Sequence, residues 1–100
     1  MKPVRFHPEA REELFHAARY YEFQQSGLGK RLVAAVRDAT QRIQAYPLLY
    51  RVLEDAVRQC RVLRFPYGLI YRPKGDRIQI IAVMHLRRKP GYWKARIKED

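Results

Sequence analysis

The second half of the chain carries side chains that could cleave or bind a phosphate backbone. Histidine is the side chain most often used as a general acid or base, and His85 leads into the run HLRRKPGYW, which contains Tyr92. Arg61 and Arg64 lie somewhat earlier in the sequence. Cleavage of RNA through its 2′-hydroxyl needs a base, an acid for the leaving oxygen and cations beside the phosphate. These four residues are therefore the candidate catalytic set of a nuclease.

The same region can be interpreted as a binding surface that performs no chemistry. Arginine and tyrosine are typical of interface hot spots. Under this interpretation His85 hydrogen-bonds at the end of a strand, and we favour that role because reactive residues are a minority among histidines. Trp93 is expected in the core. The candidate binding residues are Arg61, Arg64, Arg87, Arg88, Lys89 and Tyr92.

Positive charge is concentrated in this half of the chain. The formal net charge is +11, and 13 of the 21 Lys and Arg residues fall within residues 51–100. Such an excess indicates an acidic partner, since a fold needs no net charge and self-repulsion lowers stability. The partner could be nucleic acid, an enzyme that acts on nucleic acid, or an acidic inhibitor. A plain nucleic-acid-binding module fits the charge, but the sequence has no recognition helix or RNA-binding signature.

Length, cysteine content and hydropathy set further limits. One hundred residues with 47% hydrophobic composition predict a single domain over residues 1–100. Cys60 is the only cysteine, so it forms no internal disulfide, and we expect it in the core at the start of a strand. We expect neither a metal site nor a cofactor. No uncharged stretch approaches the ~18 residues that span a bilayer, so a cytoplasmic protein without membrane association is expected.

The first half of the sequence predicts a strand and two helices. Residues 4–6 alternate apolar and polar side chains, and Pro8 suits the first turn of a helix. Apolar side chains recur at helical spacing over residues 8–25 and again over residues 30–46. The short connector favours an antiparallel hairpin. Acidic residues that suit the helix dipole occupy the first turns, at Glu9, Glu12 and Glu13.

The second half predicts strands. Residues 48–57 are left unassigned. Three strands are expected in an antiparallel meander with a turn at residues 73–76, and they span residues 61–65, 67–72 and 77–85. The predicted fold is α+β: an N-terminal strand, an antiparallel helical hairpin, and a three-stranded antiparallel meander that forms a twisted sheet.

The last predicted strand is apolar on both faces at residues 80–83. Helices should therefore cover one face of the sheet, and the other face is a candidate docking groove. Residues 97–100, with the sequence IKED, are expected to be a loose end.

Several strings, in this order of elements, resemble one family. The chain resembles the RelE/ParE superfamily of type II toxin-antitoxin toxins, and it is most similar to the ParE branch, often labelled plasmid stabilisation proteins. The strings that carry the resemblance are FHPEA at residues 6–10, YY at 20–21, GLG at 27–29, FPYGLIY at 65–71 and IIAVMHLRRKPGYWKAR at 80–96.

The resemblance implies a partner and a target. A cognate ParD-like antitoxin with an acidic segment would bind the toxin in a hetero-oligomer, and the basic surface suits such a segment. ParE-like members inhibit DNA gyrase without chemistry of their own, whereas RelE-like members are endoribonucleases that act on mRNA in the ribosome.

One position separates the two branches. The nuclease branch commonly carries an arginine in the string YRLVY, and here the string is YGLIY with Gly68 at that place. Glycine cannot stabilise the charge that develops on a phosphate. The gyrase inhibitor is therefore the favoured hypothesis, and the ribosome-dependent mRNA endoribonuclease is the alternative.

Overall fold

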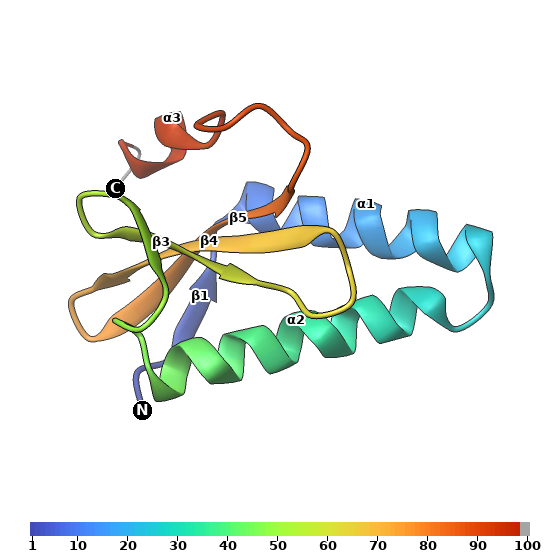
Figure 1. Cartoon of the computed structure of the whole chain (residues 1–100), viewed down its shortest axis with the longest axis horizontal. Helices are drawn as coiled ribbons and strands as arrows, with labels where there is room; N and C mark the ends of the chain where they lie inside the picture. Colours follow the sequence, from blue (N-terminus) through green and yellow to red (C-terminus); the bar gives the residue numbers. More distant parts are fainter. Residues whose placement is uncertain (99–100) are drawn as a thin grey trace.

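A computed structural model describes residues 1–98 of the chain. Two long helices lie against one face of a sheet, and a short helix lies on the opposite side (Figure 1). The helices are α1 (Pro8–Gln24), α2 (Leu28–Ala45) and α3 (Lys94–Ile97). The strands are β1 (Val4–Phe6), β2 (Arg51–Glu54), β3 (Val57–Arg61), β4 (Tyr67–Lys74) and β5 (Arg77–His85). The predicted α+β class is confirmed.

The meander has one strand more than predicted. The sheet order is β1-β5-β4-β3-β2, in which β1 runs parallel to β5 and the other neighbours are antiparallel. The prediction of three strands was wrong because the segment left unassigned contains β2. This strand turns into β3 at Asp55, whose φ is 45°. A short apolar run such as Val52 and Leu53 does not distinguish strand from helix by periodicity alone.

The strand predicted at residues 61–65 is β3, and it lies four residues earlier in the chain. Residues 62–66 form a turn, because Arg64 has a left-handed φ of 71° and Pro66 has no N–H to donate to a strand ladder. Val62 is buried although it lies outside the strand. Its burial explains why the apolar alternation continues past the strand end.

The central hairpin of β4 and β5 has a tighter turn than predicted. Only Gly75 and Asp76 separate the two strands. Gly75 has a φ of 61°, so it supplies the positive φ that the sequence led us to expect. β4 therefore extends to Lys74, two residues beyond its predicted end.

The predicted helical hairpin is confirmed with small shifts in its boundaries. α1 begins at Pro8, and the His7 Nδ1 atom caps it by accepting the N–H of Glu9 at 3.1 Å. α2 begins at Leu28, two residues earlier than predicted. Gly29 lies inside this helix and does not break it.

Gly29 allows the two helices to approach closely. A Cβ atom at this position would collide with the backbone carbonyl oxygen of Ala18 in α1. The Glu22 carboxylate completes the connection, since its two oxygens accept the N–H of Gly27 at 2.8 Å and that of Gly29 at 3.0 Å. These bonds satisfy backbone donors that the start of α2 would otherwise leave open.

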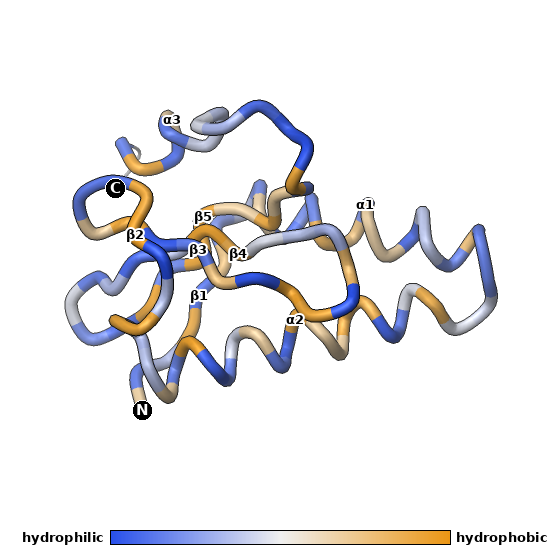
Figure 2. The backbone as a smooth tube through the Cα atoms, in the orientation of Figure 1, coloured by the Kyte–Doolittle hydropathy of each residue, from blue (hydrophilic) through white to orange (hydrophobic). Residues whose placement is uncertain are grey.

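An aliphatic core fills the space between the hairpin and the sheet. In Figure 2 the hydrophobic colour gathers where the strands lie over the helices. Cys60 belongs to this core as predicted, although it lies near the end of β3 and not at its start. The most deeply buried large side chains of this inner cluster are Leu32, Ile43, Leu69, Tyr71, Ile78 and Ile80.

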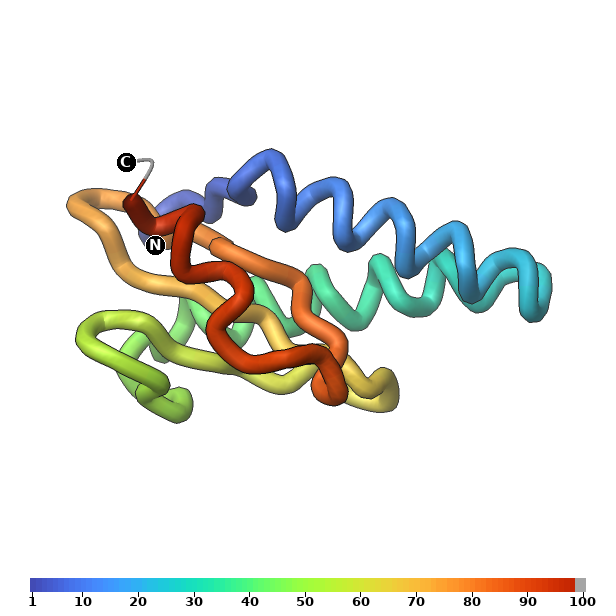
Figure 3. Tube along the Cα trace, turned by 90° about the horizontal axis from the view of Figure 1, so that it is seen from above, coloured from blue at the N-terminus to red at the C-terminus, as the bar shows by residue number. Residues whose placement is uncertain are grey.

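The C-terminal segment packs on the opposite face of the sheet, so this face is not left open as predicted, and a groove beside that segment remains. Trp93 is 3% exposed and packs with Ile70, Ile81 and Met84 in a second cluster, which confirms its predicted burial. Figure 3 shows the C-terminal segment lying over the strands. We call this second cluster the outer cluster and the first the inner cluster.

The described residues at the C-terminal end pack against the sheet. Ile97 ends α3 and packs on the outer cluster, contrary to the expected loose end. Residues 99 and 100, which were part of that expectation, lie outside the described residues. None of the helices in residues 1–98 combines the length and the apolar character needed to cross a bilayer.

Candidate binding surface

Strand register brings the two cationic segments to the same end of the sheet. Arg61 at the end of β3 pairs with Gly68 of β4, and Tyr67 pairs with His85 at the end of β5. The N–H of Leu86 also donates to the carbonyl of Pro66 at 2.9 Å. The β3–β4 turn and the segment after β5 are therefore neighbours. We call this end, with Arg61, Arg64, Arg87, Arg88 and Lys89, the cationic end.

Two residues of the cationic end line a common groove on the outer face of the sheet. It has a volume of about 490 Å³, and both Arg61 and Arg88 line it. Gly68 lies on the same face, where an added Cβ would come within 3.1 Å of the Gln59 Cγ atom. The groove continues to Arg51 and Lys94. Its charged lining is therefore mainly cationic, with Glu54 as the acidic member.

His85 faces the other side of the sheet. Its register partner Tyr67 packs with the inner cluster, whereas Arg61 shares the outer face with Met84 of the outer cluster. The His85 Nδ1 atom accepts the N–H of Arg87 at 3.1 Å, and its ring meets the Tyr67 ring edge at 5.1 Å. The alternative catalytic set is therefore divided between two faces.

Tyr92 is part of a polar cluster that the sequence did not predict. Its hydroxyl donates to the Glu13 carboxylate at 2.7 Å. Arg96 also donates to both carboxylate oxygens, at 3.0 and 2.9 Å, and only 9% of the Arg96 side chain is exposed. Arg88 reaches the same carboxylate at 3.4 Å and stacks 3.6 Å from the centre of the Tyr92 ring. We call Glu13, Arg88, Tyr92 and Arg96 the clasp.

Side chains of the clasp hydrogen-bond to the backbone of β5 where that strand, within residues 1–98, has no neighbouring strand on one side. β1 pairs only with Ile78–Ile80, so the following part of β5 has no strand on that side among the described residues. The β4–β5 pairing also skips Ile81, which leaves a bulge. Arg96 donates to the Ile81 carbonyl at 3.0 Å, and the Glu13 carboxylate accepts the Val83 N–H at 2.9 Å. Side chains thus replace a missing strand.

The environment of the clasp favours one protonation state. Burial of the Glu13 carboxyl group acts to raise its pKa, but hydrogen bonds from Arg96, Tyr92 and the Val83 N–H outweigh burial, and the pKa is lowered. Burial, followed by the bond to Glu13, raises the pKa of the Tyr92 phenol well above its usual value. Near neutral pH Glu13 is ionised and Tyr92 is protonated, so Tyr92 is not poised as a base.

The predicted binding residues therefore fall into two groups. Arg88 and Tyr92 are engaged within the clasp. Arg61, Arg64, Arg87 and Lys89 are exposed, and no ion pair joins them to another residue within the described part of the chain. Arg64 also keeps a left-handed backbone, which is uncommon for a residue other than glycine. The second group is available to a partner.

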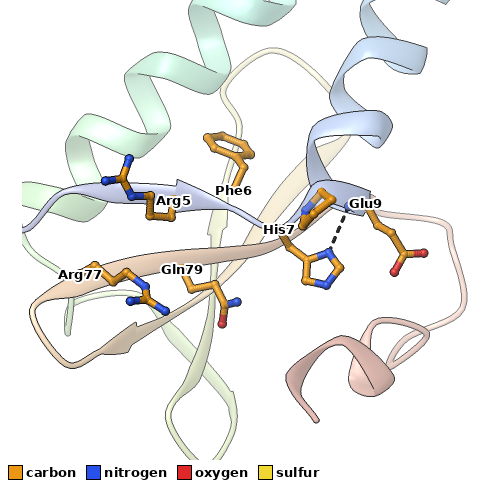
Figure 4. A pocket seen from close by; sticks show the side chains of 7 residues that line it. Arg5, Phe6, His7, Glu9, Arg77 and Gln79 are labelled. Carbon is orange, nitrogen blue, oxygen red and sulfur yellow. Dashed lines mark hydrogen bonds between the residues drawn. The ribbon is translucent and has the colours of Figure 1, made fainter. Parts of the chain in front are cut away.

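Another hollow lies away from the cationic end, beside the junction of β1 and α1. It has a volume of about 690 Å³, and Figure 4 shows Arg5 on β1, Arg77 and Gln79 on β5, and His7 and Glu9 at the start of α1 around it. His7 borders it and is engaged in capping α1. None of the predicted binding residues lines this hollow.

Comparisons with known proteins identify the class and then the family. The structure is similar to that titled "Chromosomal ParDE TA system from P. aeruginosa", with a TM-score of 0.65, 19% identity, and coverage of 87% of this chain and 98% of that chain. This likeness shows a shared fold. The family model for the ParE toxin of the type II toxin-antitoxin system parDE matches residues 4–90. The chain therefore belongs to the ParE toxin family, which confirms the resemblance. A search of curated proteins gives no match.

Proposed function

We propose that this protein arrests growth by binding DNA gyrase, and that a cognate acidic antitoxin neutralises it. Membership of the ParE toxin family supports this proposal. The main observation against a nuclease is that the candidate catalytic residues do not lie together. His85 and Arg61 lie on opposite faces of the sheet, Gly68 offers no guanidinium, and the Tyr92 phenol is held by Glu13. Function then consists of binding, and the target supplies the chemistry.

The cationic end is the proposed contact with gyrase. Its free cations project from turns held by strand pairing, so they are presented without a large entropic cost of ordering. Gyrase acts on DNA, and a surface with several unpaired arginines suits either the acidic parts of the enzyme or the DNA that it holds. Electrostatic contacts of this kind should weaken as salt concentration rises.

The test compares purified protein in two reactions run in parallel. One measures gyrase supercoiling and gyrase-dependent DNA cleavage, and the other measures cleavage of a defined mRNA on translating ribosomes. We expect inhibition in the first reaction and intact mRNA in the second. Cleaved mRNA with unaffected gyrase would establish the alternative function. His85→Ala should retain growth arrest, because its imidazole does not belong to the proposed contact.

A matched pair of variants locates the contact. Arg87→Glu combined with Lys89→Glu should weaken gyrase inhibition by roughly tenfold or more, since reversed charges oppose an acidic partner. The control combines Arg11→Glu with Arg31→Glu, which makes the same change in net charge at exposed positions on α1 and α2. Equal losses from both variants would show that net charge matters and that the cationic end is not a specific contact.

A further inference from the structure

The hollow beside the junction of β1 and α1 is lined by two arginines from neighbouring strands. Ile78 and Ile80 of β5 pack in the inner cluster, so Arg77 and Gln79, which alternate with them, face the outer side of the sheet. Arg5 of β1 is the register partner of Gln79 in the parallel pair and faces the same way. Figure 4 shows both arginines with the start of α1 beside them. Two guanidinium groups therefore line one hollow.

The charge of these two arginines is not balanced within the protein. No ion pair joins Arg5 or Arg77 to another residue within residues 1–98, although Arg77 is half-buried. Asp76 lies in the exposed turn before Arg77, and its carboxylate forms no ion pair in that part of the chain. Glu9 also lines the hollow, but its carboxylate lies 3.4 Å from the Arg96 Nε atom. Like charges on neighbouring strands repel each other, so a bound anion would relieve the repulsion.

The side chains next to the two arginines are held in place. Gln79 is only 7% exposed, and its amide oxygen accepts the Nε–H of Arg72 at 2.9 Å. Arg72 thereby brings a third positive charge close to the hollow. The His7 Nδ1 atom accepts the N–H of Glu9 and fixes the start of α1. A site that is arranged before binding loses little entropy when a ligand binds.

The size and chemistry of the hollow suit a phosphate group carried by a larger molecule. Its volume of about 690 Å³ lies within the range of roughly 300–1,000 Å³ that is usual for small-ligand sites. Guanidinium groups match the geometry of phosphate oxygens and stay charged at any physiological pH. The positive end of the α1 dipole also favours an anion there. Phe6 and Pro8 add apolar lining, which suits the sugar or base of a phosphate ester.

We propose that Arg5 and Arg77 form a binding site for the phosphate group of a nucleotide unit. Two sources share this chemistry, a free nucleotide and the backbone of DNA. The inference does not rest on the proposed function, since neither gyrase nor an antitoxin takes part in it. Arg77 begins β5, whereas the cationic end lies at the other end of that strand. Among the described residues, the hollow shares no lining residue with the groove at the cationic end.

The test follows backbone amide signals by NMR while the full chain is titrated with one probe at a time. ATP or a short DNA duplex should shift the signals of Arg5, Arg77 and Gln79 in a saturable way. Adenosine, which has no phosphate, should leave them unchanged. Shifts with ATP identify a free nucleotide as a ligand, shifts with the duplex identify the backbone of DNA, and either result supports the site. Signals that respond to neither probe, or to adenosine as strongly as to ATP, would overturn the inference.

A matched pair of variants separates this site from general attraction to a cationic protein. Arg5→Gln combined with Arg77→Gln should weaken binding of ATP or of the duplex by at least ~10-fold, since two charge-assisted contacts to phosphate are lost. The control combines Arg19→Gln with Arg31→Gln, which removes the same charge at exposed positions on α1 and α2. It should change the affinity by less than about threefold, because distant exposed charges are screened by salt. Equal losses in both variants would show that net charge alone drives binding, and would refute the inference.

Discussion

The two faces of the sheet are covered in different ways. On the inner face, α1 and α2 bury a continuous set of aliphatic side chains, and the inner cluster accounts for most of the buried core. On the outer face, the segment that follows β5 buries Trp93 on a smaller cluster and is tied down by the clasp. The inner face is held mainly by buried apolar area, and the outer face also by a few hydrogen bonds to the partly buried Glu13 carboxylate.

This difference matters because the cationic end lies beside the outer cover. Arg87 and Lys89 belong to the segment between β5 and Trp93, so their positions depend on how firmly that segment is held. Glu13 and Arg96 are 83 residues apart in sequence and join the first helix to the last. Changes to the outer cover should therefore alter binding more readily than changes to the inner cluster, which should alter overall stability.

The largest loss of stability is expected from removing one large buried side chain from the outer cluster or from the inner cluster. Trp93→Ala should lower the free energy of unfolding by about 3–5 kcal/mol, and Leu32→Ala in the inner cluster by about 2–5 kcal/mol. Hydrogen exchange should distinguish them. Trp93→Ala should mainly expose amides of residues 86–97, whereas Leu32→Ala should raise exchange across the whole sheet. Uniform exchange in both variants would show that the two covers unfold as one unit.

The next effect comes from removing the charge of the clasp. Glu13→Gln should lower the free energy of unfolding by about 2–3 kcal/mol, because the buried Arg96 then keeps only the more exposed Glu9 carboxylate, at 3.4 Å, as its ion-pair partner. Glu12→Gln is the matched control, since Glu12 is exposed on the adjacent position of α1. Denaturant unfolding measures both. Equal stability of the two variants would mean that the clasp contributes no more than surface charge.

A smaller effect is expected from removing one hydroxyl group. Tyr92→Phe keeps the ring on which Arg88 stacks but loses the bond to Glu13, and it should cost about 1 kcal/mol. Tyr20→Phe, at a residue that is 60% exposed, serves as the control and should be close to neutral. Gyrase inhibition by Tyr92→Phe should change little, because the cations of the cationic end remain.

The smallest effect is expected from titration of the Glu13 carboxyl group. Its pKa is lowered in the folded state, so its contribution to stability is complete above its unfolded pKa of about 4.3 and is lost as pH falls through the folded pKa. The difference in unfolding free energy between the unsubstituted protein and Glu13→Gln should therefore be constant at neutral pH and shrink in acid. A difference that grows in acid would contradict the lowered pKa.

Much of the fold could be predicted from sequence because its signals are local. The hairpin follows from apolar spacing, Pro8 and the glycine-containing connector, and the central strands follow from runs of β-branched residues. The strand β2 could not be predicted, since its apolar run is too short to show a period. The end of β3 was misplaced because Val62 is buried outside any strand, and burial alone sustains the alternating pattern.

The candidate site was predicted less completely. The sequence indicated which cations matter but not that Arg88 and Tyr92 are held by Glu13. No local signal marks Glu13, because an acidic residue near the start of a helix is already explained by the helix dipole. Its partner Arg96 lies beyond residues 4–90, which the family model matches. Contacts across such a separation depend on the bulge at Ile81 and the short β1, which are properties of the folded sheet.

The parallel pairing of β1 with β5 has a consequence for synthesis. β1 is the first strand to leave the ribosome, and its only partner, Ile78–Ile80, is made when most of the chain is already complete. Arg96, which binds the Glu13 carboxylate, is synthesised later still. The parallel edge of the sheet therefore cannot form until the residues of β5 have been synthesised, however early β1 becomes available.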